Sequence, residues 1–151
     1  RVKIIAGTVC QELTRIDPMH SNEFEQNLES FEHDLDSLDR NIAEILKPFA
    51  GRKIIVFHPA FGYFAQSYGL EQLAVEVEGK EPSARQLADL ITMARAEEVR
   101  IIFVQPQFSQ KNAQTIARAI GGAVVPINPL PEDYLRELEG MAEKIRDALS
   151  R

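Results

Sequence analysis

The chain has 151 residues, which is enough for one domain with a substantial core but too few for a second full domain. Its 17 lysines and arginines are outnumbered by 23 aspartates and glutamates, and the resulting net charge of -6 argues against nucleic acid or an anionic membrane surface as a partner. A single cysteine, Cys10, excludes an internal disulfide and a multi-cysteine zinc site, and no apolar run is long enough to span a bilayer.

The first 50 residues have the pattern of two helices. Residues 1–16 carry an apolar stripe formed by Val2, Ile5, Ala6, Val9, Leu13 and Ile16. After Asp17 and Pro18, apolar residues recur at steps of three and four and predict a helix over residues 22–47, with Asn22 and Glu25 spaced as a capping box. At 1.5 Å per residue this helix is roughly 39 Å long. It fits a two-faced core or coiled-coil helix as well as a rigid strut joining two lobes.

The rest of the chain alternates short β-rich runs with helical patterns. Four strands are predicted at residues 53–57, 73–77, 100–104 and 123–127. Helices are predicted at 82–98, which opens with Ser83 and Gln86 as a capping box, at 109–122, where Gly121 and Gly122 end the pattern, and at 132–149. This alternation predicts an α/β fold with a four-stranded parallel sheet flanked by helices. Pro126 predicts that the last strand is short or lies at an edge.

Polar side chains follow three of these strands. His58 follows the first, Gln105 and Gln107 follow the third, and Asn128 follows the fourth, so we expect all four on the rim where parallel sheets bind ligands. A strand-end histidine is more often a hydrogen-bonded structural residue than a ligand, but a neutral imidazole in a fixed position suits zinc. His20 and His33 have the pattern of solvated residues.

The strand ends lack the usual parts of an enzyme. Gly62 stands alone in HPAFGYF, so there is no glycine-rich phosphate loop, and no nucleophile elbow is present. The neighbouring aromatics, Phe61 to Tyr68, fit packing onto the sheet better than substrate stacking. An α/β enzyme with His58 as general base is therefore the least favoured interpretation, and we expect no enzymatic activity.

Four segments in this order carry a family resemblance: FHPAFGYFAQSYGL, EPSARQLADLI, IIFVQPQFS and INPL. Together they resemble the C-terminal lobe of the zinc-type (ZnuA/TroA-like) periplasmic metal-binding proteins of ABC transporters. The resemblance implies that residues 1–51 form a helical segment with the long connecting helix, and that residues 52–151 form the C-terminal α/β lobe of a two-lobed solute-binding protein. The N-terminal lobe, its metal ligands and a signal peptide are expected to lie outside this chain.

The resemblance also implies a metal site. His58 matches a ligand histidine of the family, whereas a carboxylate there would suggest a manganese-type member. The second ligand of this lobe is the aspartate of a DPL motif, which here reads NPL, with Asn128. Asn128 keeps an amide oxygen but not the charge, so we expect Zn²⁺, with Mn²⁺ as the alternative, to bind weakly or not at all. Asp133 is expected inside the last helix and not as a replacement.

The implied function is capture of a divalent metal, zinc first, by the extracytoplasmic solute-binding component of an ABC transporter, for import through a membrane permease. Such a protein is periplasmic or at the cell surface. The alternative is a surface adhesin of the same family with a degraded metal site. Apolar groups near His58, among them Phe61 and Tyr63, are expected to be exposed and could drive self-association.

Overall fold

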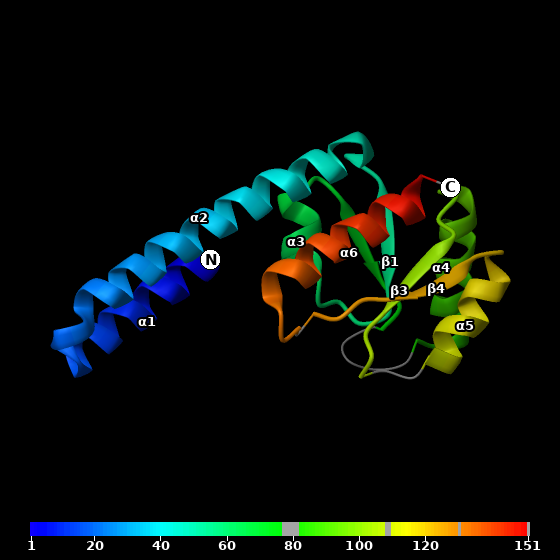
Figure 1. Cartoon of the computed structure of the whole chain (residues 1–151). Helices are drawn as coiled ribbons and strands as arrows, with labels where there is room; N and C mark the ends of the chain where they lie inside the picture. Colours follow the sequence, from blue (N-terminus) through cyan, green and yellow to red (C-terminus); the bar gives the residue numbers. More distant parts are fainter. Residues whose placement is uncertain (77–81, 108–109, 130, 151) are drawn as a thin grey trace. The chain divides into compact units, whose positions relative to one another are not determined.

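The computed structural model describes residues 1–76, 82–107, 110–129 and 131–150. It divides into two compact units, an N-terminal unit of Arg1–Asn41 and a C-terminal unit of Ile42–Arg151 (Figure 1). No helix within the described ranges is long and apolar enough to cross a membrane. Two predicted end residues lie outside those ranges: Val77, the last residue of the second predicted strand, and Ser109, the first residue of the predicted helix 109–122.

The N-terminal unit contains α1 (Val2–Ile16), the short 3-10 helix η1 (Pro18–His20) and most of α2 (Ser21–Leu46). The chain leaves the helical conformation at Asp17, where φ is -131° and ψ is 80°, because a residue before proline disfavours helical dihedrals. The long unbroken α2, with 26 residues, confirms the predicted helix. The capping box at Asn22 is wrong, because η1 runs directly into α2 and Asn22 lies inside the helix.

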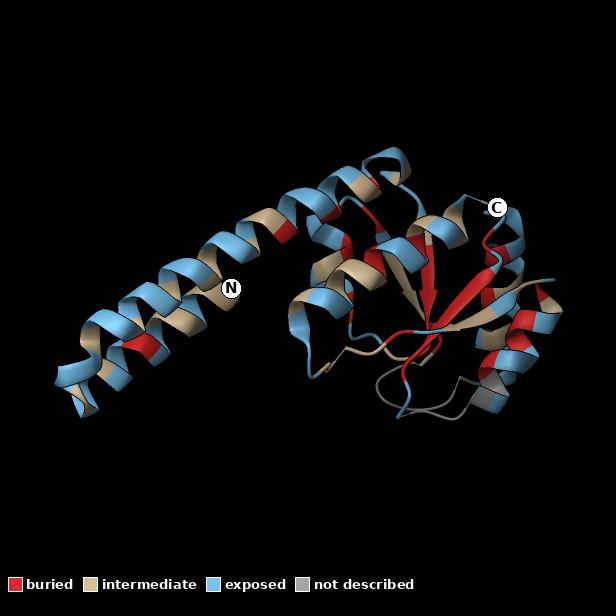
Figure 2. Cartoon of the chain, in the orientation of Figure 1, coloured by how far each residue is buried: buried red, intermediate tan, exposed pale blue. Residues whose placement is uncertain are grey.

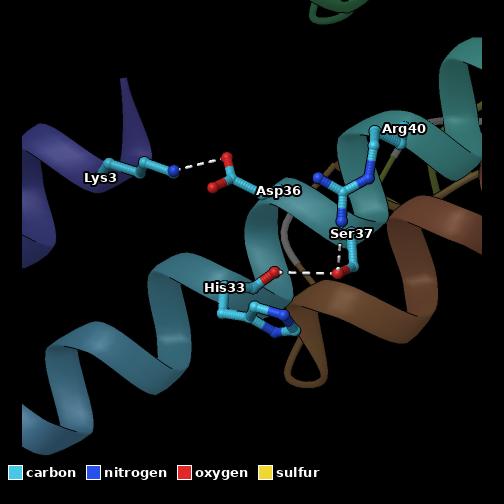
Figure 3. Close-up of polar contacts among 5 residues, drawn as sticks. All are labelled: Lys3, His33, Asp36, Ser37 and Arg40. Carbon is cyan, nitrogen blue, oxygen red and sulfur yellow. Dashed lines mark hydrogen bonds and ion pairs between the residues drawn. The ribbon is translucent and has the colours of Figure 1, made fainter.

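The apolar stripe of α1 is largely exposed within this unit. Ile5 and Ile16 are 63% and 70% exposed, whereas Cys10, which is not part of the stripe, is buried. An ion pair joins Lys3 on α1 to Asp36 on α2 (Figure 3). Next to Asp36, the Ser37 hydroxyl donates to the His33 carbonyl at 3.0 Å and accepts from Arg40 at 3.1 Å, and both bonds lie within α2. The Lys3–Asp36 ion pair therefore contributes to the pairing of α1 with α2.

The turn between these helices holds a pH-sensitive pair. His20 Nδ1 lies 2.7 Å from Asp17 Oδ2, and this hydrogen bond, followed by charge attraction, raises the pKa of His20 above its ordinary value. The pair therefore stabilises the unit below about pH 6.5, and this contribution is lost as the pH rises through the raised pKa. We expect Asp17→Asn to lower the His20 pKa towards the ordinary value in an NMR titration. Asp34→Asn, the matched control, should leave it in place.

The C-terminal unit is built on a sheet whose strand order is β2-β1-β3-β4, with every pairing parallel. The strands are β1 (Lys53–Val56), β2 (Glu71–Ala74), β3 (Ile101–Val104) and β4 (Ala123–Pro126). The predicted four-stranded parallel sheet is confirmed. The β2 strand begins two residues before the prediction, because Lys53 pairs with Glu71 at the start of the ladder. Pro126 lies on an edge strand, as expected for a residue without an amide N–H.

Helices cover both faces of the sheet (Figure 1). They are α3 (Gly62–Ser67), α4 (Ala84–Ala96), α5 (Gln110–Ala119) and α6 (Tyr134–Leu149), and the 3-10 helix η2 (Lys47–Phe49) precedes β1. A buried core joins one face of the sheet to α4 and α5, and α6 crosses the other face. The two central strands, β1 and β3, are buried along most of their length (Figure 2).

Two predicted helix boundaries show how local sequence sets these elements. Ser83 caps α4, and both hydrogen bonds of its capping box with Gln86 are present, which confirms the prediction. The α5 pattern ends at Gly121, whose φ of +67° is the left-handed conformation that favours glycine after a helix. These caps fix where the chain enters and leaves the sheet.

Candidate metal site at the carboxyl ends of the strands

His58 lies directly after β1, and main-chain and side-chain bonds fix its backbone. Phe57 donates its amide N–H to the carbonyl of Phe103 at 2.8 Å, which extends the β1–β3 pairing to the edge of the site. Gln105, which is 1% exposed, donates from Nε2 to the His58 carbonyl at 2.8 Å and accepts from the His58 amide at 3.4 Å. The structure therefore brings Gln105 against His58, as the strand-end argument predicted.

The imidazole of His58 contacts a carboxylate that the sequence argument did not identify. His58 Nδ1 lies 2.6 Å from Glu76 Oε2. The Glu76 side chain is only 10% exposed, whereas that of His58 is 40% exposed. An ionised carboxylate only accepts hydrogen bonds, so a hydrogen bond between it and Nδ1 requires the tautomer with the proton on Nδ1, in which Nε2 is the nitrogen suited to a cation.

The register of the sheet explains this contact. Val56 pairs with Ala74 in the β1–β2 ladder, and the Glu76 amide donates to the Phe57 carbonyl at 3.0 Å. Residue 58 is the second residue after the end of β1, and residue 76 is the second residue after the end of β2. The sequence pattern places Glu76 in the interior of a strand predicted at 73–77, and the contact was therefore not expected. Pairing the two strands in parallel from Lys53 and Glu71 would have revealed it.

Asn128 follows the edge strand at the same end of the sheet. The Ile127 amide donates to the Val104 carbonyl at 3.0 Å, so Asn128 is the first residue beyond that bond, and it is partly buried. Because β3 separates β1 from β4, the axes of the strands that carry His58 and Asn128 lie about 10 Å apart. The two side chains must lean towards each other to bind one ion. Gln107, the fourth expected member of the rim, is exposed.

The aromatic residues after His58 divide into buried and exposed ones. Phe61 is 4% exposed, and its amide donates to the Gln72 side chain on β2 at 2.8 Å, so the expectation that Phe61 is exposed is wrong. Phe61 is the N-cap residue of α3, and this bond joins its backbone to β2. Tyr63 is 68% exposed, as expected. Phe64 and Tyr68 pack against each other with ring centroids 4.8 Å apart.

No acidic shell around His58 is found in the ranges that the structure describes. Asp133 caps α6 by accepting from the Arg136 amide at 3.2 Å, so it lies just before the helix and not inside it as expected. Within the described residues, no group of three or more histidine, cysteine, aspartate and glutamate side chains is arranged to hold a metal. His58 would contribute one imidazole nitrogen to a metal site, and Asn128 would contribute one neutral amide oxygen.

A hollow of about 480 Å³ lies at the opposite end of the strands. Its lining includes Arg52, Lys53 and Arg100 at the amino ends of β1 and β3, together with the last turn of α6. Lys53 is paired with Glu97 at 2.6 Å, and the carbonyl end of α6 disfavours an anion there. The charged groups around this hollow do not make it a metal site, even though it is large. The imidazole of His58 favours the rim at the carboxyl ends of the strands as the metal site.

Comparison with known proteins identifies the family. A family model described as zinc-uptake complex component A, periplasmic (ZnuA), matches residues 1–148. The chain belongs to the ZnuA family. The resemblance found in the four sequence segments is thereby confirmed. ZnuA proteins are binding components of zinc-uptake systems and not enzymes, which agrees with the absence of catalytic motifs in the sequence.

Curated ZnuA relatives match nearly the whole chain. The high-affinity zinc uptake system protein ZnuA of Brucella suis is 28% identical over an alignment of 159 residues. The alignment covers 99% of this chain and 47% of the relative. ZnuA of Bacillus subtilis is 30% identical over 141 residues, covering 92% of this chain and 42% of the relative. The chain thus spans about half the length of the curated relatives it matches.

Solved structures agree with this assignment. A crystal structure of ZnuA is 41% identical, with a TM-score of 0.94 over 97% of this chain and 58% of that one. The laminin-binding protein Lmb of Streptococcus agalactiae, described as bifunctional with adhesin and metal-transporting activity, is 26% identical, with a TM-score of 0.85 over 93% of this chain and 57% of that one. The predicted fold, including the long helix, is that of ZnuA.

Proposed function

We propose that this chain is part of an extracytoplasmic solute-binding protein that captures a divalent metal ion, zinc first, and delivers it to an ABC permease. The observation that carries the proposal is His58, which the neighbouring strands hold at the carboxyl end of the sheet in a chain of the ZnuA family. The high-affinity zinc uptake named for the relatives supports zinc as the cargo. The proposed location is the periplasm or the cell surface.

The proposed division of the chain follows the family comparison. Residues 1–51 would form the helical segment with the connecting helix, and residues 52–151 the C-terminal lobe of a two-lobed protein. The relatives are about twice as long as this chain, which supports a second lobe that supplies further metal ligands. The site in the whole protein would then combine donors from both lobes.

Within this lobe, we propose His58 and Asn128 as the metal contacts. An imidazole nitrogen suits zinc better than manganese, whereas carboxylate and carbonyl oxygens suit manganese. Asn128 contributes a neutral oxygen, and the ligand count is well below the three or four that a tight zinc site needs. Binding by this chain alone should therefore be weak, with dissociation constants in the roughly high-micromolar to millimolar range.

Calorimetry with the metal-free chain tests this function. Zinc and manganese are titrated separately, at the same ionic strength and without chelator. We expect weak binding of zinc and weaker binding of manganese, because one imidazole is the strongest donor. Equal affinity for both ions, or a preference for manganese, would contradict the proposal that zinc is the cargo.

An adhesin function is the second candidate. The structural relative Lmb is described as both an adhesin and a metal transporter, and the neutral Asn128 is the kind of change a degraded metal site would show. Binding of the chain to immobilised laminin, measured by surface plasmon resonance, tests this candidate, and a lack of binding would contradict it. The proposed self-association near His58 now rests on Tyr63, because Phe61 is buried.

A further inference from the structure

We propose that Glu76 is a positioning residue for metal capture: it holds the His58 imidazole with the proton on Nδ1 and so presents Nε2 to the cation. This inference rests on the proposed role of His58 as a metal ligand. It concerns the orientation and tautomer of the ring, which the chain sets before any ion arrives.

The backbones of both residues are fixed independently of their side-chain contact. Gln105 bonds the amide and the carbonyl of His58, and the Glu76 amide bonds the Phe57 carbonyl. Loss of the Glu76 carboxylate therefore removes the contact to the ring while the strand ends keep their other bonds. This separation makes the role of the carboxylate testable without dismantling the sheet.

The contact also has the geometry that selects one tautomer. The Nδ1 to Oε2 distance is 2.6 Å, and Glu76 is shielded from solvent to a much greater extent than His58. Free histidine in water favours the proton on Nε2, so the carboxylate must reverse this preference. Histidines that bind metals commonly donate the other ring N–H to a carboxylate or carbonyl, which fixes the ring and raises its basicity as a ligand. The contact between Glu76 and His58 has the geometry both to select the Nδ1–H tautomer and to hold the ring in place.

The orientation of the ring follows from the same contact. His58 has one neighbour strand that supplies Gln105 to its backbone and another that supplies Glu76 to its ring. With Nδ1 directed to the Glu76 side of the sheet, Nε2 lies across the ring from that carboxylate. A cation bound at Nε2 would not compete with Glu76 for the same nitrogen.

Nitrogen NMR of the imidazole tests the first part of this proposal without zinc. In uniformly ¹⁵N-labelled chain at about pH 9, where an ordinary imidazole is neutral, we expect Nδ1 of His58 to give the protonated signal and Nε2 the unprotonated one. Glu76→Ala should move His58 towards the opposite pattern. Glu76→Gln should retain part of the original pattern, because the amide oxygen can still accept from Nδ1. Glu71→Ala, which removes a carboxylate from the exposed start of the same strand, is the matched control.

Zinc calorimetry tests whether Glu76 supports metal binding. The Glu76 variants are made in a chain that also carries Asn128→Asp, because the higher zinc affinity expected of that chain makes a loss of affinity measurable. We expect Glu76→Ala to weaken zinc binding about 10- to 100-fold, as changes to the outer partner of a metal-binding histidine do, and Glu71→Ala to leave it unchanged. An unaltered NMR pattern in Glu76→Ala, or an altered pattern with unchanged zinc affinity, overturns the role of Glu76. If His58→Ala also leaves zinc affinity unchanged, the metal site itself is wrong and the role of Glu76 falls with it.

Discussion

His58→Ala is expected to abolish zinc binding by this chain, and Asn128→Asp is expected to strengthen it. His58 supplies the only strong donor of the proposed pair, so its removal leaves a neutral amide oxygen and water. Asn128→Asp replaces the neutral oxygen with an anionic one, which should tighten binding by at least on the order of tenfold, or about 1.4 kcal/mol. Calorimetry of the three proteins under chelator-free conditions measures both effects.

Matched variants in the N-terminal unit control for changes in charge and composition. His33→Ala removes an exposed imidazole, and Asn27→Asp adds a carboxylate on an exposed position of α2. Neither should change zinc affinity. Nanomolar binding by the unmodified chain, or binding that survives His58→Ala, would mean that the metal binds elsewhere and that the residues carried over from the family resemblance are wrong.

Gly122→Ala is expected to destabilise the C-terminal unit by about 3 kcal/mol or more, because the new methyl group meets the backbone of a neighbouring strand. A Cβ atom at this position would lie 1.9 Å from the carbonyl oxygen of Arg100 and 2.6 Å from its carbonyl carbon. The segment cannot easily shift, since Gly122 donates to Ala117 at 2.7 Å and Ala123 donates to the same Arg100 oxygen at 2.8 Å.

Urea unfolding of Gly122→Ala, followed by circular dichroism, measures this loss. The control is Gly140→Ala in α6, where the added methyl group would meet nothing within 4 Å apart from the adjacent residues and backbone of its own helix. There the gain in helix propensity should stabilise the unit by about 0.5–1 kcal/mol. A Gly122→Ala protein as stable as its parent would show that β4 does not approach β3 as closely as the structure indicates.

The sequence was sufficient for those parts of the fold that depend on local patterns. The apolar runs of β1 and β3 predict strands buried on both faces, and such strands need helices on each side. Pro126 predicts an edge because it has no N–H to donate, and Ser83 predicts a helix start because its hydroxyl satisfies an amide there. His58 and Asn128 were placed at the strand ends because each follows a strand run directly, and the family resemblance implied that both are ligands.

Features that depend on distant parts of the chain could not be predicted in this way. Glu76 follows β2 and His58 follows the neighbouring strand β1, and only the register of these two strands brings the residues together. Phe61 is buried, and its amide bonds the Gln72 side chain on β2, a contact that aromatic composition does not indicate. Asn22 has the spacing of a helix cap, but the preceding η1 has already started the helical path.

The parallel register of β1 and β2 has a consequence for the order of events during folding. The proposed metal site has no local nucleus: residues 58, 76, 105 and 128 come from four separate segments, and the sheet must be paired before they meet. We therefore do not expect zinc to bring them together in the unfolded chain, in contrast to small domains that fold around their metal. We expect the sheet to form from its apolar strands before an ion binds, and an ion bound afterwards would stabilise the folded unit by mass action. Under the proposed function, the C-terminal unit would then be folded before it receives a metal ion.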